Sequence, residues 1–210
     1  MTSNPATRAV QQQFGAVAAA YATSAVHASG PDLAAMVAAA GEAKGRRVLD
    51  LGCGAGHAGM AFAAAGASVT AVDVTPEMVE VANELASQRG LADFSARVAD
   101  VSALPFDDAS FDVVVSRFSA HHYAEPARAL SEAARVLSAG GRFLLVDTVP
   151  PEDASLDTFF NAFEFVRDAS HVRNWRASEW LRMLAGAGFR DGAVLDRFAI
   201  TLDFADWVKR

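Results

Sequence analysis

The sequence predicts one α/β domain built around a doubly wound, mostly parallel β-sheet. Three observations support this prediction. Between positions 46 and 149, short apolar segments alternate with helical segments of about a dozen residues. The short segments are apolar at successive positions, which is typical of strands covered on both faces. The chain has 210 residues, 52% of them hydrophobic, so a single domain can bury a sizeable core.

Residues 1–45 are rich in alanine and predict helices that cover the sheet. One helix is expected over residues 11–21. A second helix is expected from Pro31 to about Ala40, because proline followed by Asp32 is typical of a helix start and Gly41 follows the end.

The central region, residues 46–149, predicts five strands, at residues 47–51, 68–73, 94–98, 111–116 and 142–149. Helices are expected between them at residues 57–65, 76–88 and 126–137. The second of these helices has the clearest signals, since Thr75 can cap its N-terminus, Pro76 suits its first turn and Gly90 lies past its end. The alternation predicts that residues 46–149 are the ligand-binding core.

Two segments follow this core. Residues 150–176 are an insertion after the fifth strand, with a helix expected over residues 157–167. Residues 177–210 predict a helix over residues 178–187 and a sixth strand over residues 195–204, in which Phe198, Ile200, Leu202 and Phe204 share one face.

Composition excludes several classes of protein. The net charge is −7, which argues against a nucleic-acid partner because such a surface needs an excess of Lys and Arg. Cys53 is the only cysteine, so neither an intrachain disulfide nor a thiolate zinc cluster is expected. No apolar stretch approaches the roughly 20 residues of a spanning helix, and no signal-peptide pattern is present. We therefore expect a cytoplasmic protein without stable membrane insertion.

The strongest local signal is residues 48–56, Val-Leu-Asp-Leu-Gly-Cys-Gly-Ala-Gly, in which a strand leads through alternate glycines into a helix. Two ligands fit such a loop. Residues 54–59 match G-x-G-x-x-G, which predicts NAD(P) and an oxidoreductase. Asp50 favours a cationic ligand instead, because a carboxylate repels a pyrophosphate but can hold an ammonium group directly or through water.

The string acid-x-Gly-x-Gly-x-Gly, from Asp50 to Gly56, resembles the first motif of class I S-adenosylmethionine-dependent methyltransferases. Leu-Pro-Phe-x-x-x-Ser-Phe-Asp at residues 104–112 and Ala-Arg-Val-Leu-Ser-Ala-Gly-Gly-Arg at residues 134–142 are similar to the ubiquinone and menaquinone biosynthesis type (methyltransferase type 11). Ala139 stands where proline is more usual, which affects only a turn. The resemblance covers residues 14–189. It implies a Rossmann-like methyltransferase fold, S-adenosylmethionine as cofactor, and a small, apolar or aromatic methyl acceptor.

The resemblance also implies the cofactor contacts. Gly52, Gly54 and Gly56 form the loop. Asp73 ends the second strand, where a carboxylate can accept hydrogen bonds from both ribose hydroxyls, although it would serve NAD equally. An acid such as Asp100 accepts from the adenine amino group, and the amide of Val101 faces a ring nitrogen. The predicted set is completed by Val74, Met78 and Ser116.

Catalytic groups are expected just after the fourth strand, beside the methyl group. His121 and His122 stand there, and an imidazole, which titrates near pH 6.5, suits a base or a donor to the acceptor. The alternative is that they cap a helix and fill a wall. In the resembled group, an N-terminal helix often places a tyrosine near the methyl group, and Tyr21 fits that position. The alternative is that Tyr21 anchors the helix to the core. His27 lies in the same covering segment. No Cys, Asp or third His stands at ligand spacing, so no metal is expected.

The insertion at residues 150–176 is the expected lid over the methyl acceptor, because loops at this edge of the sheet carry specificity. Phe159 and Phe163 are four residues apart and share a helix face. They are predicted to contact an apolar acceptor, with packing in the core as the alternative for each ring. Arg167, His171 and Arg173 are predicted to supply polar and cationic contacts.

The end of the chain carries a separate expectation. Methyltransferase sheets of this class usually have seven strands, and only six are predicted here. We therefore expect a missing seventh strand and an exposed strand edge, which either the last segment or a second copy in a homodimer covers. An oxidoreductase, and a cofactor-binding domain without activity of its own, remain the alternatives to a methyltransferase.

Overall fold

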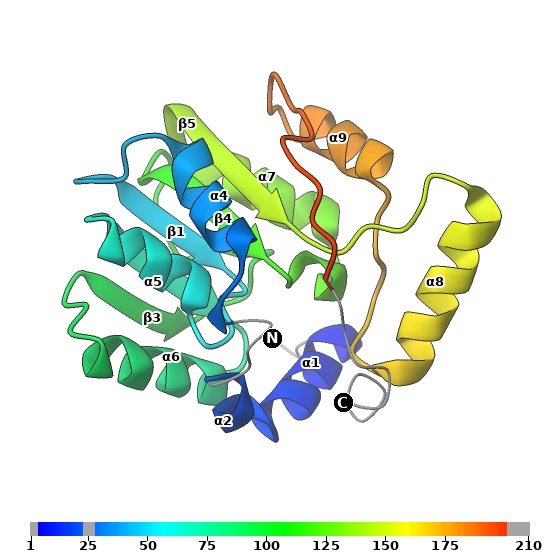
Figure 1. The fold of residues 1–210 in the computed structure, drawn as a ribbon, viewed down its shortest axis with the longest axis horizontal. Helices are drawn as coiled ribbons and strands as arrows, with labels where there is room; N and C mark the ends of the chain where they lie inside the picture. Colours follow the sequence, from blue (N-terminus) through cyan, green and yellow to red (C-terminus); the bar gives the residue numbers. More distant parts are fainter. Residues whose placement is uncertain (1–3, 23–27, 201–210) are drawn as a thin grey trace.

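The structure, a computed structural model, describes residues 4–22 and 28–200. Its centre is a five-stranded sheet in the order β3-β2-β1-β4-β5, and every neighbouring pair is parallel (Figure 1). The strands are β1 (Arg47–Leu51), β2 (Ser68–Asp73), β3 (Phe94–Val98), β4 (Phe111–Arg117) and β5 (Leu137–Val146). The predicted doubly wound parallel sheet is confirmed. Its strand order reverses between β1 and β4, where folds of this type bind ligands.

Helices cover both faces of this sheet (Figure 1). The first face packs against α4 (Pro31–Ala40), α5 (His57–Ala64) and α6 (Pro76–Gln88), and the second against α7 (Pro126–Val136) and α9 (Ala177–Gly186). The strands supply both cores by alternation: Val48 belongs to the first core and Leu49 to the second, and both are fully buried. Burial on both faces explains why the strands read as continuous apolar segments.

The N-terminal segment forms two helices instead of the single helix predicted over residues 11–21. These are α1 (Pro5–Gly15) and α2 (Ala18–Tyr21). The first starts early because the Asn4 side chain accepts a hydrogen bond from the Ala6 amide at 3.0 Å and Pro5 suits the first turn. Both helices pack against α6 below the carboxyl ends of the strands as drawn in Figure 1.

The predicted boundary between α7 and β5 was wrong. The helix ends at Val136, and β5 begins at Leu137 instead of residue 142 and ends at Val146 instead of residue 149. Leu137 pairs with Phe111 and Arg142 with Val113, so the residues between them form a bulge, in which Gly140 has a φ of +78°. Gly140 and Gly141, which follow the predicted helix end at residue 137, therefore lie inside a bulged strand.

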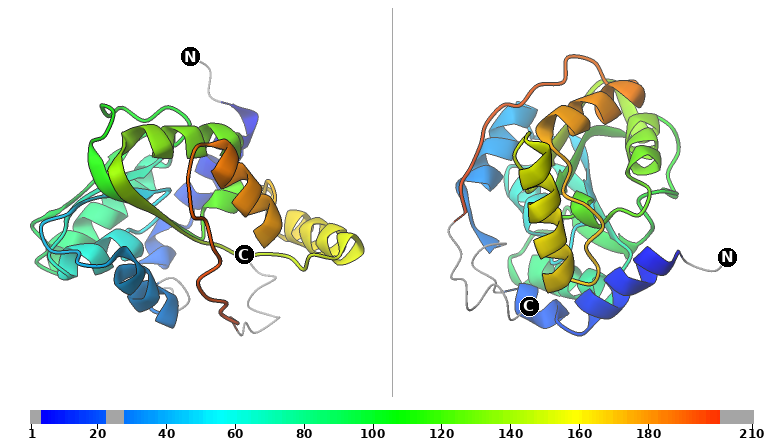
Figure 2. Two further views of the ribbon diagram at one scale, coloured as in Figure 1. Left: turned by 90° about the horizontal axis from the view of Figure 1, so that it is seen from above. Right: turned by 90° about the vertical axis from the view of Figure 1, so that its right-hand side faces the viewer.

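After β5 the chain forms α8 (Ala154–Arg167), which projects from one end of the molecule (Figure 2). It begins before the predicted residue 157 because the Asp153 carboxylate accepts from the amides of Ser155 and Leu156. The predicted strand at residues 195–204 is wrong for residues 195–200, which form no strand, and residues 201–204 lie outside the described residues. Leu195 and Ile200 are exposed, so no neighbouring strand supplies them with hydrogen bonds or cover.

Candidate functional site

The glycine loop follows β1 at the carboxyl edge of the sheet. Gly52 and Gly54 have φ values of +60° and +52°, a region that favours glycine. A Cβ atom at Gly52 would lie 2.8 Å from the Ser119 hydroxyl, so that position has no room for a side chain. A Cβ atom at Gly54 would meet nothing within 4 Å, because Gly54 faces an open cleft. We call it the strand-end cleft.

Most of the predicted cofactor contacts line this cleft. They are Asp50, Gly52, Gly54, Asp73, Val74, Met78, Asp100 and Val101. Two predicted contacts do not line it. Gly56 faces the core, since a Cβ atom there would lie 2.9 Å from the Phe94 ring. Ser116 is fully buried beneath the cleft. The sequence thus identified the loops around the cleft, and the structure separates the residues that face it from those that support it.

Asp50 is a buried carboxylate at the floor of the strand-end cleft. Its Oδ2 accepts a hydrogen bond from the Gly59 amide at 2.8 Å. Burial raises the pKa of Asp50 to about 7, with the nearby negative charge of Asp73 adding to the effect, and the Gly59 bond and Arg117 opposing it. A cation placed beside Asp50 would therefore stabilise its ionised form.

Asp73, at the end of β2, holds two loops together. Its Oδ2 accepts from the Gly54 amide and its Oδ1 from the Thr75 amide, both at 2.9 Å. Burial raises the pKa of Asp73 against these hydrogen bonds. Each carboxylate oxygen has two lone pairs, so Asp73 can accept two further hydrogen bonds from a ligand.

Asp100 and Val101 follow β3 and form the far wall of the cleft. The Asp100 Oδ1 accepts from the Ser102 amide at 2.8 Å and from its hydroxyl at 2.6 Å. This turn fixes the direction of the carboxylate and leaves Oδ2 for a ligand.

Ser119 and Tyr123 are site residues that the sequence analysis missed. Their hydroxyls each donate to the carbonyl oxygen of Leu51 at 3.1 Å, and both contact the Ser116 hydroxyl. Burial raises the pKa of Tyr123, so its hydroxyl stays protonated. This cluster holds the ends of β1 and β4 together beneath the glycine loop. Its signal, hydroxyl residues shortly after Ser116, is too common to stand out in a sequence.

The N-terminal helices close one side of the strand-end cleft. Gln11 donates to the Val74 carbonyl at 2.9 Å, and the His57 Nε2 donates to the Tyr21 carbonyl at 3.1 Å. Tyr21 lines the cleft, with its ring edge-on to Phe14 at a centroid distance of 5.6 Å. His27 lies outside the described residues. The described N-terminal residues therefore contact two of the segments that line the strand-end cleft.

A second opening, which we call the β5 groove, runs along β5, α4 and residues 188–200 and encloses about 1810 Å³. It meets the strand-end cleft at four side chains that line both: Phe14, Tyr21, Phe118 and His122. A molecule in the groove can thus approach a ligand in the cleft at this junction.

His121 and His122 stand side by side at the junction, in a 3₁₀ turn that follows β4 (Ala120–His122). The Nδ1 of His121 donates to Asp147 Oδ1 at 2.6 Å. The Nδ1 of His122 donates to the Ser170 carbonyl at 3.1 Å. The sequence analysis missed Asp147 because it placed this residue inside a strand predicted to run to residue 149, whereas β5 ends at Val146 and Asp147 directly follows it.

The predicted acceptor contacts are not brought together. Phe159 and Phe163 stack on each other at a centroid distance of 6.4 Å, but their side chains are 70% and 37% exposed and line neither opening. Phe160 lines the β5 groove in their place. The reason is helix rotation: Phe160 is one position from Phe159 and so lies on a different face of α8.

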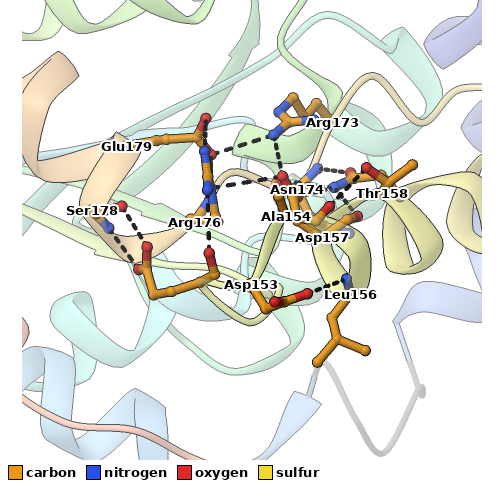
Figure 3. A network of polar contacts seen from close by, with 12 residues as sticks. Asp153, Ala154, Leu156, Asp157, Thr158, Arg173, Asn174, Arg176, Ser178 and Glu179 are labelled. Atoms are coloured by element: carbon orange, nitrogen blue, oxygen red, sulfur yellow. Dashed lines mark hydrogen bonds and ion pairs between the residues drawn. The ribbon is translucent and has the colours of Figure 1, made fainter.

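The three predicted polar contacts of the lid have separate places. Arg167 lines the β5 groove and contacts Glu164 at 2.7 Å. His171 is buried, with its ring 5.7 Å from that of His121. Arg173 points away from the groove and joins α8 to α9 through Asp157 at 2.7 Å and Glu179 at 3.4 Å (Figure 3). Of the three, only Arg167 therefore lines an opening, whereas Arg173 tethers α8 to α9.

A buried ion pair links the covering helices to β4. Arg117 donates through Nε to the Asp32 carboxylate, and both side chains are less than a tenth exposed. Arg117 lines the strand-end cleft and Asp32 the β5 groove. The pair was missed because the two residues are 85 positions apart and neither belongs to a motif.

Two further observations concern the described residues alone. No three His, Cys, Asp or Glu side chains among them are arranged to hold a metal ion. None of the helices in the described part of the chain is long and apolar enough to cross a membrane.

Comparisons with known proteins place this site in context. The family described as a methyltransferase domain matches residues 49–145. The uncharacterized methyltransferase YcgJ of Bacillus subtilis (strain 168) is 39% identical over 199 residues, which cover 94% of this chain and 78% of YcgJ. The protein YafE of Escherichia coli (strain K12) is 36% identical over 68% of this chain and 69% of its own. A demethylmenaquinone methyltransferase of Clavibacter sepedonicus is 40% identical over 51% of this chain and 43% of its own.

The fold gives the same result. The crystal structure of YcgJ superposes with a TM-score of 0.80 at 38% sequence identity, and the match covers 84% of this chain and 75% of YcgJ. The two folds are therefore alike over most of both chains.

Proposed function

The chain belongs to the methyltransferase domain family and has its Rossmann-like fold, and we propose that it transfers a methyl group from S-adenosylmethionine to a small apolar or aromatic molecule. Neither the family match nor the relatives support a nicotinamide-dependent oxidoreductase or an inactive binding domain.

The observation that carries the proposal is the chemistry of Asp50. This carboxylate is buried beside the glycine loop, and burial raises its pKa to about 7. Such a group is suited to a ligand that brings a positive charge and is unsuited to a pyrophosphate. The ammonium of the amino-acid tail of S-adenosylmethionine fits it. When bound, the cofactor supplies an activated methyl group, which is bonded to a positively charged sulfonium sulfur.

The residues of the strand-end cleft have complementary roles in this proposal. Asp50 attracts the ammonium group, Asp73 accepts hydrogen bonds from the ribose hydroxyls, and Asp100 accepts from the adenine amino group. Val101, Val74 and Met78 supply apolar walls, and Gly54 leaves room for the ligand. Tyr21, Phe14 and His122 exclude water where the cleft meets the β5 groove.

The acceptor occupies the β5 groove in this proposal. Phe118 and Phe160 give the groove aromatic walls, and Arg167 offers a cation. The Clavibacter sepedonicus relative is named for a demethylmenaquinone substrate, which is a small and largely apolar molecule. Both points support an apolar or aromatic acceptor.

Calorimetry with S-adenosylhomocysteine tests the cofactor assignment, with NAD as the comparison ligand. We expect S-adenosylhomocysteine to bind and NAD to show no heat of binding at the same concentrations. The reverse result would overturn the proposal. A screen of aromatic and quinone-type acceptors with radiolabelled methyl donor then identifies the acceptor.

The binding of S-adenosylhomocysteine is expected to weaken as the pH falls below about 7. The bound ammonium favours ionised Asp50 and so lowers its pKa in the complex. Below the pKa of free Asp50, about 7, the ligand must displace a proton, which costs up to about tenfold in affinity per pH unit. Calorimetry in two buffers of different ionisation enthalpy measures the released proton. Asp50→Asn should remove the proton release. If the affinity of the unsubstituted protein did not change as the pH falls below about 7, that result would contradict the role of Asp50.

The lid proposed for residues 150–176 predicts a local change in hydrogen exchange. The segment after α8 is fixed, since the amides of Val172 and Arg173 donate to the His121 carbonyl at 3.0 and 3.1 Å. The helix α8 projects from the molecule and exposes Phe159. We therefore expect ligands to slow exchange in residues 154–167 and to leave residues 170–174 unchanged. Equal exchange in α8 with and without ligands would indicate a rigid insertion.

A further inference from the structure

We propose that His121 and Asp147, which both line the β5 groove, form a proton-accepting pair, and that the acceptor is a hydroxylated aromatic or enolic compound that loses a proton to His121 as it is methylated. The inference rests on the proposed function and adds to it the identity of the base and the class of acceptor.

The first step of the argument is the orientation of the His121 ring. Asp147 Oδ1 accepts from the His121 Nδ1 at 2.6 Å, and Asp147 Oδ2 accepts from the His121 backbone amide at 2.9 Å. The Thr148 amide also donates to Oδ1, at 2.8 Å. Asp147 is therefore fixed by three hydrogen bonds, and it holds the imidazole in the tautomer with the proton on Nδ1. The lone pair is left on Nε2, which can take a proton from a molecule in the groove that His121 lines.

The second step is the contrast with His122. Its Nδ1 donates to the neutral carbonyl of Ser170, and its ring centroid lies 4.1 Å from that of His121. Two rings at this distance do not both carry a positive charge readily, so at most one of them is an imidazolium at a time. The carboxylate of Asp147 favours the charge on His121. His121 is the base and His122 stays neutral at the junction.

The charged surroundings support this assignment. The groups facing His121 are Asp147 after β5, Glu164 and Arg167 from α8, Asp168 and His171 from the following segment, and His122 beside it. Burial disfavours the protonated ring, but the charge and hydrogen bond of Asp147, together with Glu164 and Asp168, outweigh burial and raise the pKa of His121. Burial and the charge of His121 lower the pKa of His122 to about 3 and that of His171 to about 4.

The proton balance follows from these positions. The O–H bond, or the C–H bond of an enolisable acceptor, breaks, and its proton passes to Nε2 of His121. The acceptor's electron pair forms the bond to the methyl group, while the electron pair of the broken sulfur–methyl bond stays on sulfur. The imidazolium, stabilised by Asp147, then releases the proton to water. An acceptor without an ionisable proton would have no use for this pair.

The test begins with the unsubstituted protein and needs no acceptor. Imidazole resonances of the protein saturated with S-adenosylhomocysteine are followed by nuclear magnetic resonance as a function of pH. We expect His121 to carry its proton on Nδ1 when neutral, to titrate above 6.5, and to remain the more basic of the two neighbouring rings. In Asp147→Asn the pKa of His121 should fall, whereas the matched substitution Asp93→Asn, at an exposed residue before β3, should leave it unchanged.

Turnover with a panel of probes supplies the second readout. The panel contains 2-naphthol and 1,4-naphthohydroquinone, which have ionisable protons, and quinoline, which has none on its nucleophilic nitrogen. We expect methylation of the hydroxy compounds only, with kcat rising with pH through the pKa of His121. His121→Gln should lower kcat by about 100-fold or more. Asp147→Asn should lower kcat by at least about tenfold and shift the acidic limb of the profile to lower pH, a shift that a merely structural role would not cause.

Each other outcome has a definite meaning. Failure of S-adenosylhomocysteine to bind would overturn the proposed function. If S-adenosylhomocysteine binds but neutral His121 carries its proton on Nε2, the assignment of His121 as the base would be overturned and the proposed function would stand. The same conclusion would follow if the pKa of His121 did not change in Asp147→Asn. Methylation of quinoline but of neither hydroxy compound, or of none of the three, would overturn the acceptor class.

Discussion

Replacing Asp73 with alanine is expected to weaken the binding of S-adenosylhomocysteine by about 100-fold or more. The carboxylate is proposed to accept hydrogen bonds from two ribose hydroxyls, and a hydrogen bond to a charged group contributes about 1.5–3 kcal/mol. Asp73 also accepts hydrogen bonds from the amides of Gly54 and Thr75, so its loss loosens the glycine loop that shapes the strand-end cleft. The lost ligand contacts and the loosened loop both lower the affinity.

Calorimetry measures this effect, and Asp93→Ala is the matched control because Asp93 is exposed and precedes β3 at the opposite edge of the sheet. Thermal unfolding without ligand shows whether the Asp73→Ala protein is still folded. A folded Asp73→Ala protein that binds S-adenosylhomocysteine as tightly as the unsubstituted protein would refute the ribose assignment.

Asp32→Asn is expected to lower the free energy of unfolding by about 3–5 kcal/mol, since it removes one charge of a buried ion pair and leaves the other. Arg117 and Asp32 are only 5% and 8% exposed at their side chains. The guanidinium would lose its carboxylate partner in a place where water screens charge poorly.

Asp108→Asn provides the contrast for that experiment. Asp108 also pairs with an arginine, Arg135, at 2.9 Å, but its side chain is 80% exposed. Removing such a surface partner should cost less than about 1 kcal/mol. Denaturant unfolding of the two variants measures both values. Equal and small losses would mean that the pair of Arg117 and Asp32 is hydrated and contributes little to the fold.

Arg117 connects this stability effect to function. It lines the strand-end cleft, while its partner Asp32 lines the β5 groove from α4. An asparagine at position 32 is therefore expected to alter both openings as well as the stability.

The features that could be predicted from the sequence are those with a local signal. The apolar segments of β1, β2 and β4 reflect burial on both faces, and this leaves a continuous pattern in the chain. Asp50, Gly52, Gly54 and Asp73 lie at the ends of such strands. In a parallel sheet these ends meet at one edge, so the order of the strands predicted that these residues converge around the strand-end cleft.

Other features were decided by tertiary structure. His121 and Asp147 are 26 residues apart, and Arg117 and Asp32 are 85 apart. A single hydrogen bond between distant residues has no period and leaves no trace in the local sequence. The same applies to Ser119 and Tyr123, whose position beneath the glycine loop depends on the pairing of β1 with β4.

The insertion and the last described segment have regular patterns in the sequence, but these patterns did not determine how the segments pack. Phe159 and Phe163 have the spacing of a helix face, which the sequence did determine, but the direction of that face depends on how α8 leaves the sheet. Phe198 and Ile200 have the spacing of one strand face, yet a strand exists only where a neighbouring backbone supplies hydrogen bonds. Periodicity thus defined most strands and helices of this protein and the loops around its strand-end cleft, whereas the partners of its charged and aromatic side chains were set by packing between segments that are distant in the chain.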